Sequence, residues 1–187
     1  DTFLEIILNC HKNFTEHGDI VSRTFDRAVE IKDTEALLQS FIVVVNYIDT
    51  DSEYATDLFK RAVHVLNEQN CNWANAIWFR DEISDLISHL PETEIDGLLN
   101  ILLQLESVDH VVEETLRPIT KFYPEKVIDW FETRIARQME IPRDEGLYKR
   151  YDAIPFEFRR LASPLAEHAE IVRSKVFQWF YNEGWLY

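Results

Sequence analysis

The chain has 187 residues, of which 46% are hydrophobic and 13% aromatic, and it contains only four Gly and six Pro. This composition supplies a large core and excludes global disorder, and it leaves too few turn residues for a β-sandwich or barrel. The formal net charge is −15, and residues 1–116 carry 7 basic against 23 acidic side chains. We therefore expect no nucleic-acid binding and no attachment to anionic membranes.

Apolar residues recur with helical spacing through nearly the whole chain, as in Phe3, Leu4, Ile7 and Leu8 near its start. The "FIVVV" run at 41–45 is apolar all round and favours a helix buried on several sides. A break is expected at "EHGD", and 141–154 is the one long irregular stretch. The predicted helices cover about residues 2–15, 19–31, 34–48, 53–67, 73–89, 92–106, 109–121, 125–140, 155–163 and 164–182.

Helix starts are marked by residues that satisfy the first backbone amides. The expected caps and first-turn residues are Asp33 or Thr34, the Thr50–Glu53 capping box, Asn72, Pro91, Asp109, Pro124 and Ser163 followed by Pro164. The fold class that follows is all-α, with about ten helices stacked as antiparallel pairs in a single domain, 1–187. Its most regular part is 34–140, and 155–187 holds the C-terminal helices.

One phrase occurs twice, 33 residues apart, as "PETEIDGLL" at 91–99 and "PEKVIDWFE" at 124–132. A fainter copy, "SEYATDLF", lies at 52–59. In each copy Pro or a cap is followed by Glu near the positive helix end and by apolar residues that face inward. Helix pairs that recur every 33–40 residues are typical of a stacked α-solenoid.

On this phrase the chain resembles HEAT or armadillo repeats, and more loosely tetratricopeptide repeats, over roughly residues 34–140. The "YPEKVIDWFE" wording is similar to helical arms of large bacterial regulatory ATPases. The resemblance implies a solenoid segment that binds or positions other proteins. A compact helical bundle in which the two Pro-Glu starts coincide by chance is the alternative.

Motifs for catalysis are absent from the sequence: there is no P-loop, dinucleotide fingerprint, zinc-protease motif or nucleophile elbow. Three His–carboxylate pairs stand one helical turn apart, namely His64/Glu68, Asp85/His89 and His110/Glu114. Each has the spacing of two metal ligands, but a catalytic site needs a third. We therefore interpret them as solvated contacts and expect neither cofactor nor metal.

Candidate protein-binding residues lie in three places. Acidic residues cluster at one helix–turn–helix corner and at the preceding one, and equivalent corners of a stack would line one edge. The 141–154 loop mixes Arg with Tyr, and "VFQWFYNEGWLY" at 176–187 has more aromatic residues than one buried face needs. The candidates are Asp81, Asp85, Glu92, Asp96, Tyr148, Arg150, Tyr151, Trp179 and Trp185.

The sequence thus predicts a non-catalytic protein-interaction or scaffolding module with a protein partner, which is basic if the acidic edge is functional, and self-association through the aromatic tail. Two alternatives remain: an acidic inhibitor that mimics a nucleic acid, and a helical metalloenzyme. No apolar run spans a bilayer and the start of the given sequence has no basic-then-apolar signal pattern, so we expect a cytoplasmic protein. Cys10 and Cys71 are expected to be reduced thiols. The start at Asp1 without Met suggests a fragment of a longer chain.

Overall fold

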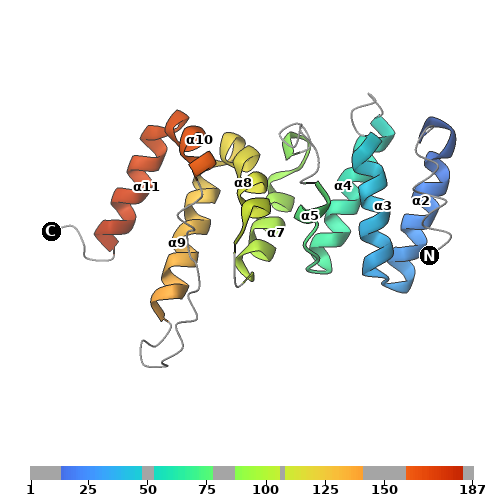
Figure 1. Ribbon diagram of the computed structural model, residues 1–187, viewed down its shortest axis with the longest axis horizontal. Coiled ribbons are helices and arrows are strands. Elements are labelled where there is room, and N and C mark those ends of the chain that lie inside the picture. The colour runs from blue at the N-terminus through green and yellow to red at the C-terminus, as the bar shows by residue number, and fades with distance from the viewer. Residues whose placement is uncertain (1–13, 48–52, 78–86, 106–107, 141–158, 183–187) are drawn as a thin grey trace. The chain divides into compact units, whose positions relative to one another are not determined.

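The computed structural model describes residues 14–47, 53–77, 87–105, 108–140 and 159–182 (Figure 1). Within these ranges every regular element is helical and none is a strand, which confirms the all-α class. The chain divides into two compact units, Asp1–Leu98 and Leu99–Tyr187. The boundary falls inside helix α7 (Glu92–Leu103). The ten-helix count, the stacking into a solenoid and the single domain stay predictions.

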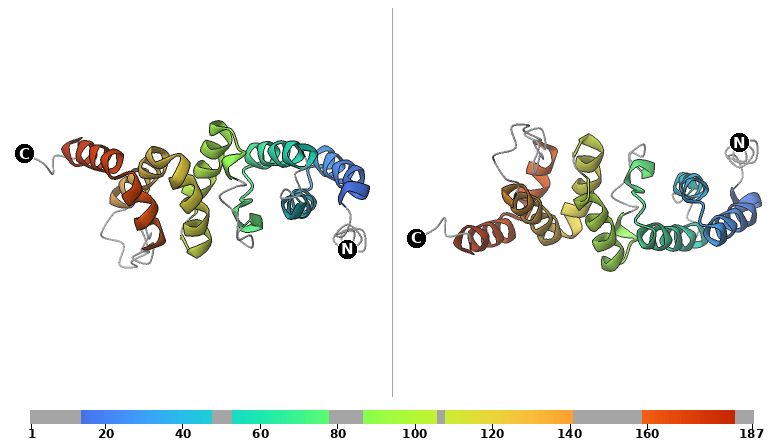
Figure 2. Two further views of the ribbon diagram at one scale, coloured as in Figure 1. Left: turned by 90° about the horizontal axis from the view of Figure 1, so that it is seen from above. Right: turned by 90° about the horizontal axis from the view of Figure 1, so that it is seen from below.

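The first unit contains α2 (Phe14–Ile31), α3 (Thr34–Tyr47), α4 (Glu53–Glu68), the short α5 (Ala74–Ile77) and the start of α7. Helix α3 packs against α2, α4 and α5, and α2 also touches α4. Figure 2 shows α2 and α4 lengthwise in one layer and α3 nearly end-on in the other. Consecutive helices in this unit therefore alternate between two layers.

The core of the first unit is built around α3, which is buried on several sides as its apolar run predicts. Leu37, Phe41 and Val44 have no exposed surface. The Phe41 ring stacks on Phe59 of α4 at 5.6 Å between centroids and meets the edge of Trp73 at 5.7 Å. Ring pairs in these geometries add to the stabilisation that burial provides. Asp33, one of the two expected caps, accepts the Ala36 amide at 3.0 Å.

The break expected at "EHGD" is wrong, because α2 begins at Phe14 and continues through Gly18. A glycine inside a helix costs only about 1 kcal/mol relative to alanine and does not by itself end the helix.

Helices α2 and α4 end in the same way, without glycine. After α2, the Lys32 amide bonds to the Val29 carbonyl and the Asp33 amide to Ala28, at 3.2 and 3.0 Å. After α4, Asn70 and Cys71 repeat the pattern. Lys32 and Asn70 have φ values of 56° and 54°. This is the Schellman motif, in which a left-handed residue satisfies the last carbonyls of a helix.

The second unit contains α8 (His110–Phe122), α9 (Pro124–Glu140), the 3₁₀ turn η2 (Arg159–Leu161), α10 (Ala162–Glu167) and α11 (Ala169–Asn182). Helix α9 packs against both α8 and α11, while α10 and η2 pack against α8. The Asp109 cap is confirmed, since its carboxylate accepts the Val111 and Val112 amides at 3.0 and 3.3 Å. Pro124 begins α9, as the phrase predicts.

The single helix expected over 164–182 is wrong. The chain forms α10 and α11 instead, separated at His168, whose amide bonds to Leu165 three residues back. Ser163 lies inside α10 and does not cap it. The reason is tertiary: α10 packs on α8 whereas α11 packs on α9, and one straight helix does not follow both. None of the described helices is long and apolar enough to cross a membrane.

Candidate functional site

A polar cluster among the described residues of the first unit lies where the end of α4 meets the start of α7, and Asn67 is at its centre. The Asn67 amide nitrogen donates to the Glu94 backbone carbonyl at 3.0 Å and to Glu94 Oε2 at 2.7 Å. Its oxygen accepts the Trp73 indole N–H at 2.8 Å. Because indole only donates, this contact fixes the orientation of the amide. We call this cluster the α4–α7 junction.

Gly97 allows the close approach of the two helices at this junction. A Cβ atom on Gly97 would lie 2.6 Å from Asn67 Nδ2 and 2.8 Å from its Cγ. Those distances are shorter than real contacts, so any other residue forces the amide away from Glu94. Asn72 holds the adjoining turn, since its side chain accepts the Ala74 amide at 3.1 Å, as predicted for a cap.

His64, on the exposed side of the junction, lies between two carboxylates. Its Nδ1 is 2.9 Å from Glu94 Oε1, and its Nε2 is 3.5 Å from Glu68 Oε1. The hydrogen bond to Glu94, followed by that carboxylate's charge, raises the pKa of His64 above its usual value of 6.5. The predicted His64/Glu68 contact is confirmed. A doubly protonated imidazole, which donates from both nitrogens, fits this arrangement.

In the part of the chain that the structure describes, no group of three or more His, Cys, Asp or Glu residues could hold a metal ion. The His64 side chain is 57% exposed. Of the other pairs, Asp85 lies outside the described residues. Glu114 forms an ion pair with Arg160 of η2, while the neighbouring Glu113 accepts the Arg160 amide at 2.7 Å.

The expected alignment of acidic corners along one edge is wrong. The start of α7 lies beside the end of α4, because Asn67 contacts Glu94. Glu53 and Asp57, at the start of α4, are therefore about 15–20 Å away along the helix axis, at 1.5 Å per residue. Glu92 is exposed and Asp96 half-buried at the start of α7, and we call these two the acidic corner. Glu94 is bound to His64 and Asn67.

The remaining candidates lie mostly beyond what the structure describes. Asp81, Asp85, Tyr148, Arg150, Tyr151 and Trp185 all fall outside the described residues. Trp179 lies in α11, where only its backbone is described. The structure therefore brings together Glu92 and Asp96 at the start of α7 and places Trp179 in the other unit.

Sequence reasoning missed a second junction, where α9 meets the end of α7 within the second unit. Arg134 is completely buried, and its Nη1 donates to the Leu102 and Leu105 carbonyls at 3.3 and 2.9 Å. Its guanidinium lies 5.2 Å from the centre of the Trp130 ring, and Trp130 donates to the Leu99 carbonyl at 3.1 Å. Arg137 donates to Leu103 at 2.8 Å. We call this cluster the α7–α9 junction.

The repeated phrase contains the signal for this junction. Shifted by 33 residues, Arg134 matches Ile101, which is also buried. Helical spacing alone would group Ile128 with Phe131 and Ile135 on one inward face, but Phe131 and Ile135 are only half-buried. Besides Ile128, the buried stripe contains Val127, Trp130 and Arg134. An arginine that shares the helical spacing of apolar residues is the signal that could have identified the buried face of α9.

Exposed large apolar side chains gather on the first and last described helices. They are Ile20 and Ile31 on α2, Phe177 and Tyr181 on α11, and Phe122 on α8. Cys71 is buried and free of any disulfide, and burial raises the pKa of its thiol.

Comparison of the chain with protein-family models, with curated proteins and with solved structures finds no significant match.

Proposed function

We propose that this chain is a non-catalytic helical-repeat module that binds or positions another protein. The observation that carries the proposal is the equivalence of the two phrase copies. Pro91 immediately precedes α7 and Pro124 begins α9. Ile95 and Ile128 are buried, as are Ile101 and Arg134 at the matching positions of the next turns. Recurrent helices that bury residues at matching positions support a repeat architecture of the HEAT or armadillo kind.

The alternation of α2, α3 and α4 between two layers also supports this architecture, because solenoids stack helix pairs in this way. Such proteins act through extended surfaces and not through enclosed active sites. A role as the arm of a larger regulatory ATPase is part of the same proposal, motivated by the wording of the second copy. A reducing cytoplasm is proposed as the location, with the free thiol of Cys71 in support.

The acidic corner is the proposed contact for a basic protein partner. Glu92 and Asp96 lie at the N-terminal turns of α7, next to the His64–Glu94 pair. Charges placed at the edge of an interface speed association and select the partner more than they add affinity. The aromatic tail is proposed to serve a separate purpose, self-association.

The test is affinity capture from a cell extract with the whole chain as bait, eluted in steps of salt. A matched pair of variants separates a specific site from general acidity. Glu92→Gln/Asp96→Asn removes two charges at the acidic corner, and Glu167→Gln/Glu170→Gln removes two exposed charges on α10 and α11. We expect one stoichiometric protein that survives about 200 mM salt, where purely electrostatic binding is largely lost.

The corner variant should release that protein at a lower salt concentration, and the control variant should keep it. Equal loss from both variants would assign the binding to net charge alone. A group of basic proteins that elute together at low salt would instead favour the nucleic-acid mimic.

A further inference from the structure

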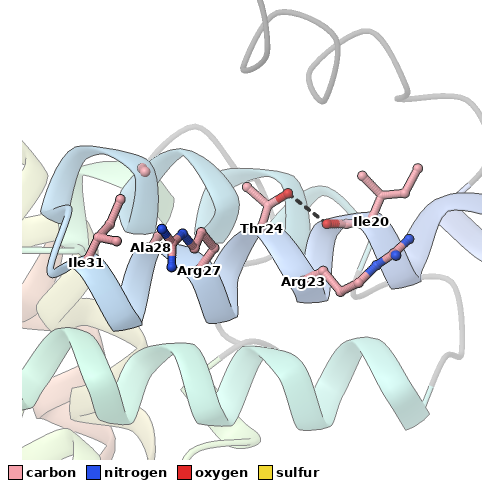
Figure 3. A pocket seen from close by; sticks show the side chains of 7 residues that line it. Ile20, Arg23, Thr24, Arg27, Ala28 and Ile31 are labelled. Atoms are coloured by element: carbon pink, nitrogen blue, oxygen red, sulfur yellow. Dashed lines mark hydrogen bonds between the residues drawn. The ribbon is translucent and has the colours of Figure 1, made fainter.

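A groove of about 420 Å³ runs along α2 in the first unit. Its floor is apolar, formed by Ile20, Thr24, Ala28 and Ile31, and Figure 3 shows Ile20, Thr24 and Ile31 on one side of the helix. The Thr24 hydroxyl donates to the Ile20 carbonyl at 2.8 Å, which leaves its methyl group to the groove. Ile20 and Ile31 remain 37% and 53% exposed.

The charged residues among the described groove lining are Arg23 and Arg27, four residues apart. Arg27 pairs with Glu30 at 2.8 Å, but both side chains are about two-thirds exposed, so this contact is weak and is easily exchanged. The groove thus combines an apolar floor with a row of guanidinium groups. That combination fits aromatic side chains, which bury apolar surface and also accept a cation on the ring face.

An aromatic pair of this kind lies on α11, in the second unit. Phe177 and Tyr181 are 54% and 69% exposed and stand four residues apart on one face. A ridge of residues spaced by four on one helix packs into the groove beside a row of the same spacing on another. Ile20, Thr24 and Ala28 form such a row. The chain already stacks arginine on aromatic rings, at Arg61–Phe25 and Arg134–Trp130.

We propose that the α2 groove of one copy receives Phe177 and Tyr181 of a second copy. This inference rests on the proposed interaction role and deepens it by naming the surface that the tail helix binds. The contact is heterologous, since the two copies contribute different surfaces, so it leaves a free groove on one copy and a free aromatic pair on the other. Association therefore continues beyond the dimer unless the assembly closes into a ring.

Complementation between two blocked variants tests this arrangement. Ile20→Glu/Ile31→Glu places carboxylates in the groove and leaves α11 unchanged. Phe177→Glu/Tyr181→Glu blocks α11 and leaves the groove unchanged. All four side chains are exposed, so the fold should survive, which circular dichroism checks. The mass of each species is measured by sedimentation over about 10–500 µM, the range expected for a small, transient interface.

We expect the wild-type chain to exceed monomer mass with rising concentration and each variant alone to stay monomeric. An equimolar mixture of the two variants should give a one-to-one heterodimer and nothing larger, because only one groove and one aromatic pair remain usable. Phe122→Glu is the matched control, an exposed aromatic residue of α8 at 43%. This variant should assemble as the wild type does.

Three results would overturn the inference: a wild-type chain that stays monomeric, a mixture that forms no heterodimer, or a Phe122→Glu variant that dissociates as well. A monomeric wild type would mean that flanking chain or another protein covers the two faces. The Glu92→Gln/Asp96→Asn variant should still self-associate. If it does so while capturing no partner, only the proposed function fails. If capture succeeds and self-association does not occur, only this inference fails.

Discussion

The two ends of α7 are held by different chemistry. At its start, in the first unit, a neutral amide from α4 bonds to Glu94, and the acidic residues Glu92 and Glu94 lie in the first turn. At its end, in the second unit, α9 supplies Arg134 and Arg137 to the last carbonyls. Helix α7 has no basic residue in its own last turn.

This difference follows the helix dipole. Negative charge is favourable at a helix N-terminus and positive charge at its C-terminus, where four carbonyls lack intrahelical partners. At the N-terminus of α7 the acidic residues belong to α7 itself. At the C-terminus of α7 the cations come from α9, about 30 residues later in the sequence. The C-terminal arrangement therefore exists only when α9 is docked. The α7–α9 junction thus depends more on tertiary packing than the α4–α7 junction does.

The largest effect is expected from Arg134→Met, which breaks the α7–α9 junction. The substitution keeps apolar bulk but removes the arginine donor from the Leu102 and Leu105 carbonyls and the cation over Trp130. We expect the free energy of unfolding to fall by about 3 kcal/mol, measured by urea denaturation.

Arg137→Met is the matched control in the same helix. Arg137 is exposed and makes one hydrogen bond to Leu103, so its loss should cost about 0.5 kcal/mol. Equal effects for the two substitutions would contradict the importance given to burial at this junction.

The next effect is expected from Gly97→Ala at the α4–α7 junction. Alanine normally stabilises a helix interior by about 1 kcal/mol relative to glycine. Here the new methyl group collides with the Asn67 side chain, so we expect a loss of about 2 kcal/mol instead. A double-mutant cycle with Asn67→Ala checks the cause, because removing the amide should relieve most of the clash. Additive effects of the two substitutions would locate the cost elsewhere.

A smaller effect is expected when the indole donor of each junction is removed. Trp73→Phe deletes the hydrogen bond to Asn67, and Trp130→Phe deletes the one to Leu99. Both side chains are buried, so each change should cost about 1.5 kcal/mol through the lost bond and a small cavity. Chemical denaturation of both variants compares the junctions directly. A nearly neutral result at either junction would show that its indole hydrogen bond does not stabilise the fold.

The smallest effect concerns pH and only the α4–α7 junction. Because Glu94 raises the pKa of His64 in the folded chain, protonated His64 stabilises the folded state. This contribution is fully present below the usual value of 6.5 and is lost as the pH rises through the folded pKa. The wild type should therefore melt slightly above a His64→Gln variant near pH 6, and the difference should vanish at about pH 8.5.

The Glu94→Gln variant provides a second check on His64. An NMR titration should find its imidazole pKa lowered toward the ordinary value in this variant, because both the hydrogen bond to the carboxylate and its charge are removed. An unchanged titration would assign the raised pKa to another group.

Local patterns in the sequence predicted much of the fold. The caps at Asp33, Asn72 and Asp109 and the start of α9 at Pro124 all match, because capping depends on residues only two or three positions apart. The two wrong boundaries, at Gly18 and His168, have different causes. The cost of Gly18 is small beside the rest of α2, and the break at His168 follows from the packing of α10 on α8.

The candidate site was less predictable. Glu94, which lies between the acidic candidates Glu92 and Asp96, is bound by His64 and Asn67, and Arg134 is buried although arginine is usually exposed. The bonds of Glu94 and of Arg134 both join residues that are 27 to 32 positions apart in the sequence. No local sequence pattern shows that such residues are close in space. The alignment of the acidic corners failed for a related reason, since the end of α4 and not its start lies beside α7.

The sequence by itself determined most of the described helices and several of their caps, because periodicity and capping are properties of neighbouring residues. Only the tertiary structure decided which polar groups turn inward, which carbonyls receive arginine, and which apolar faces stay exposed on α2 and α11. Those outcomes depend on the docking of whole helices, where burying a polar side chain is favourable only if its partners are already in place.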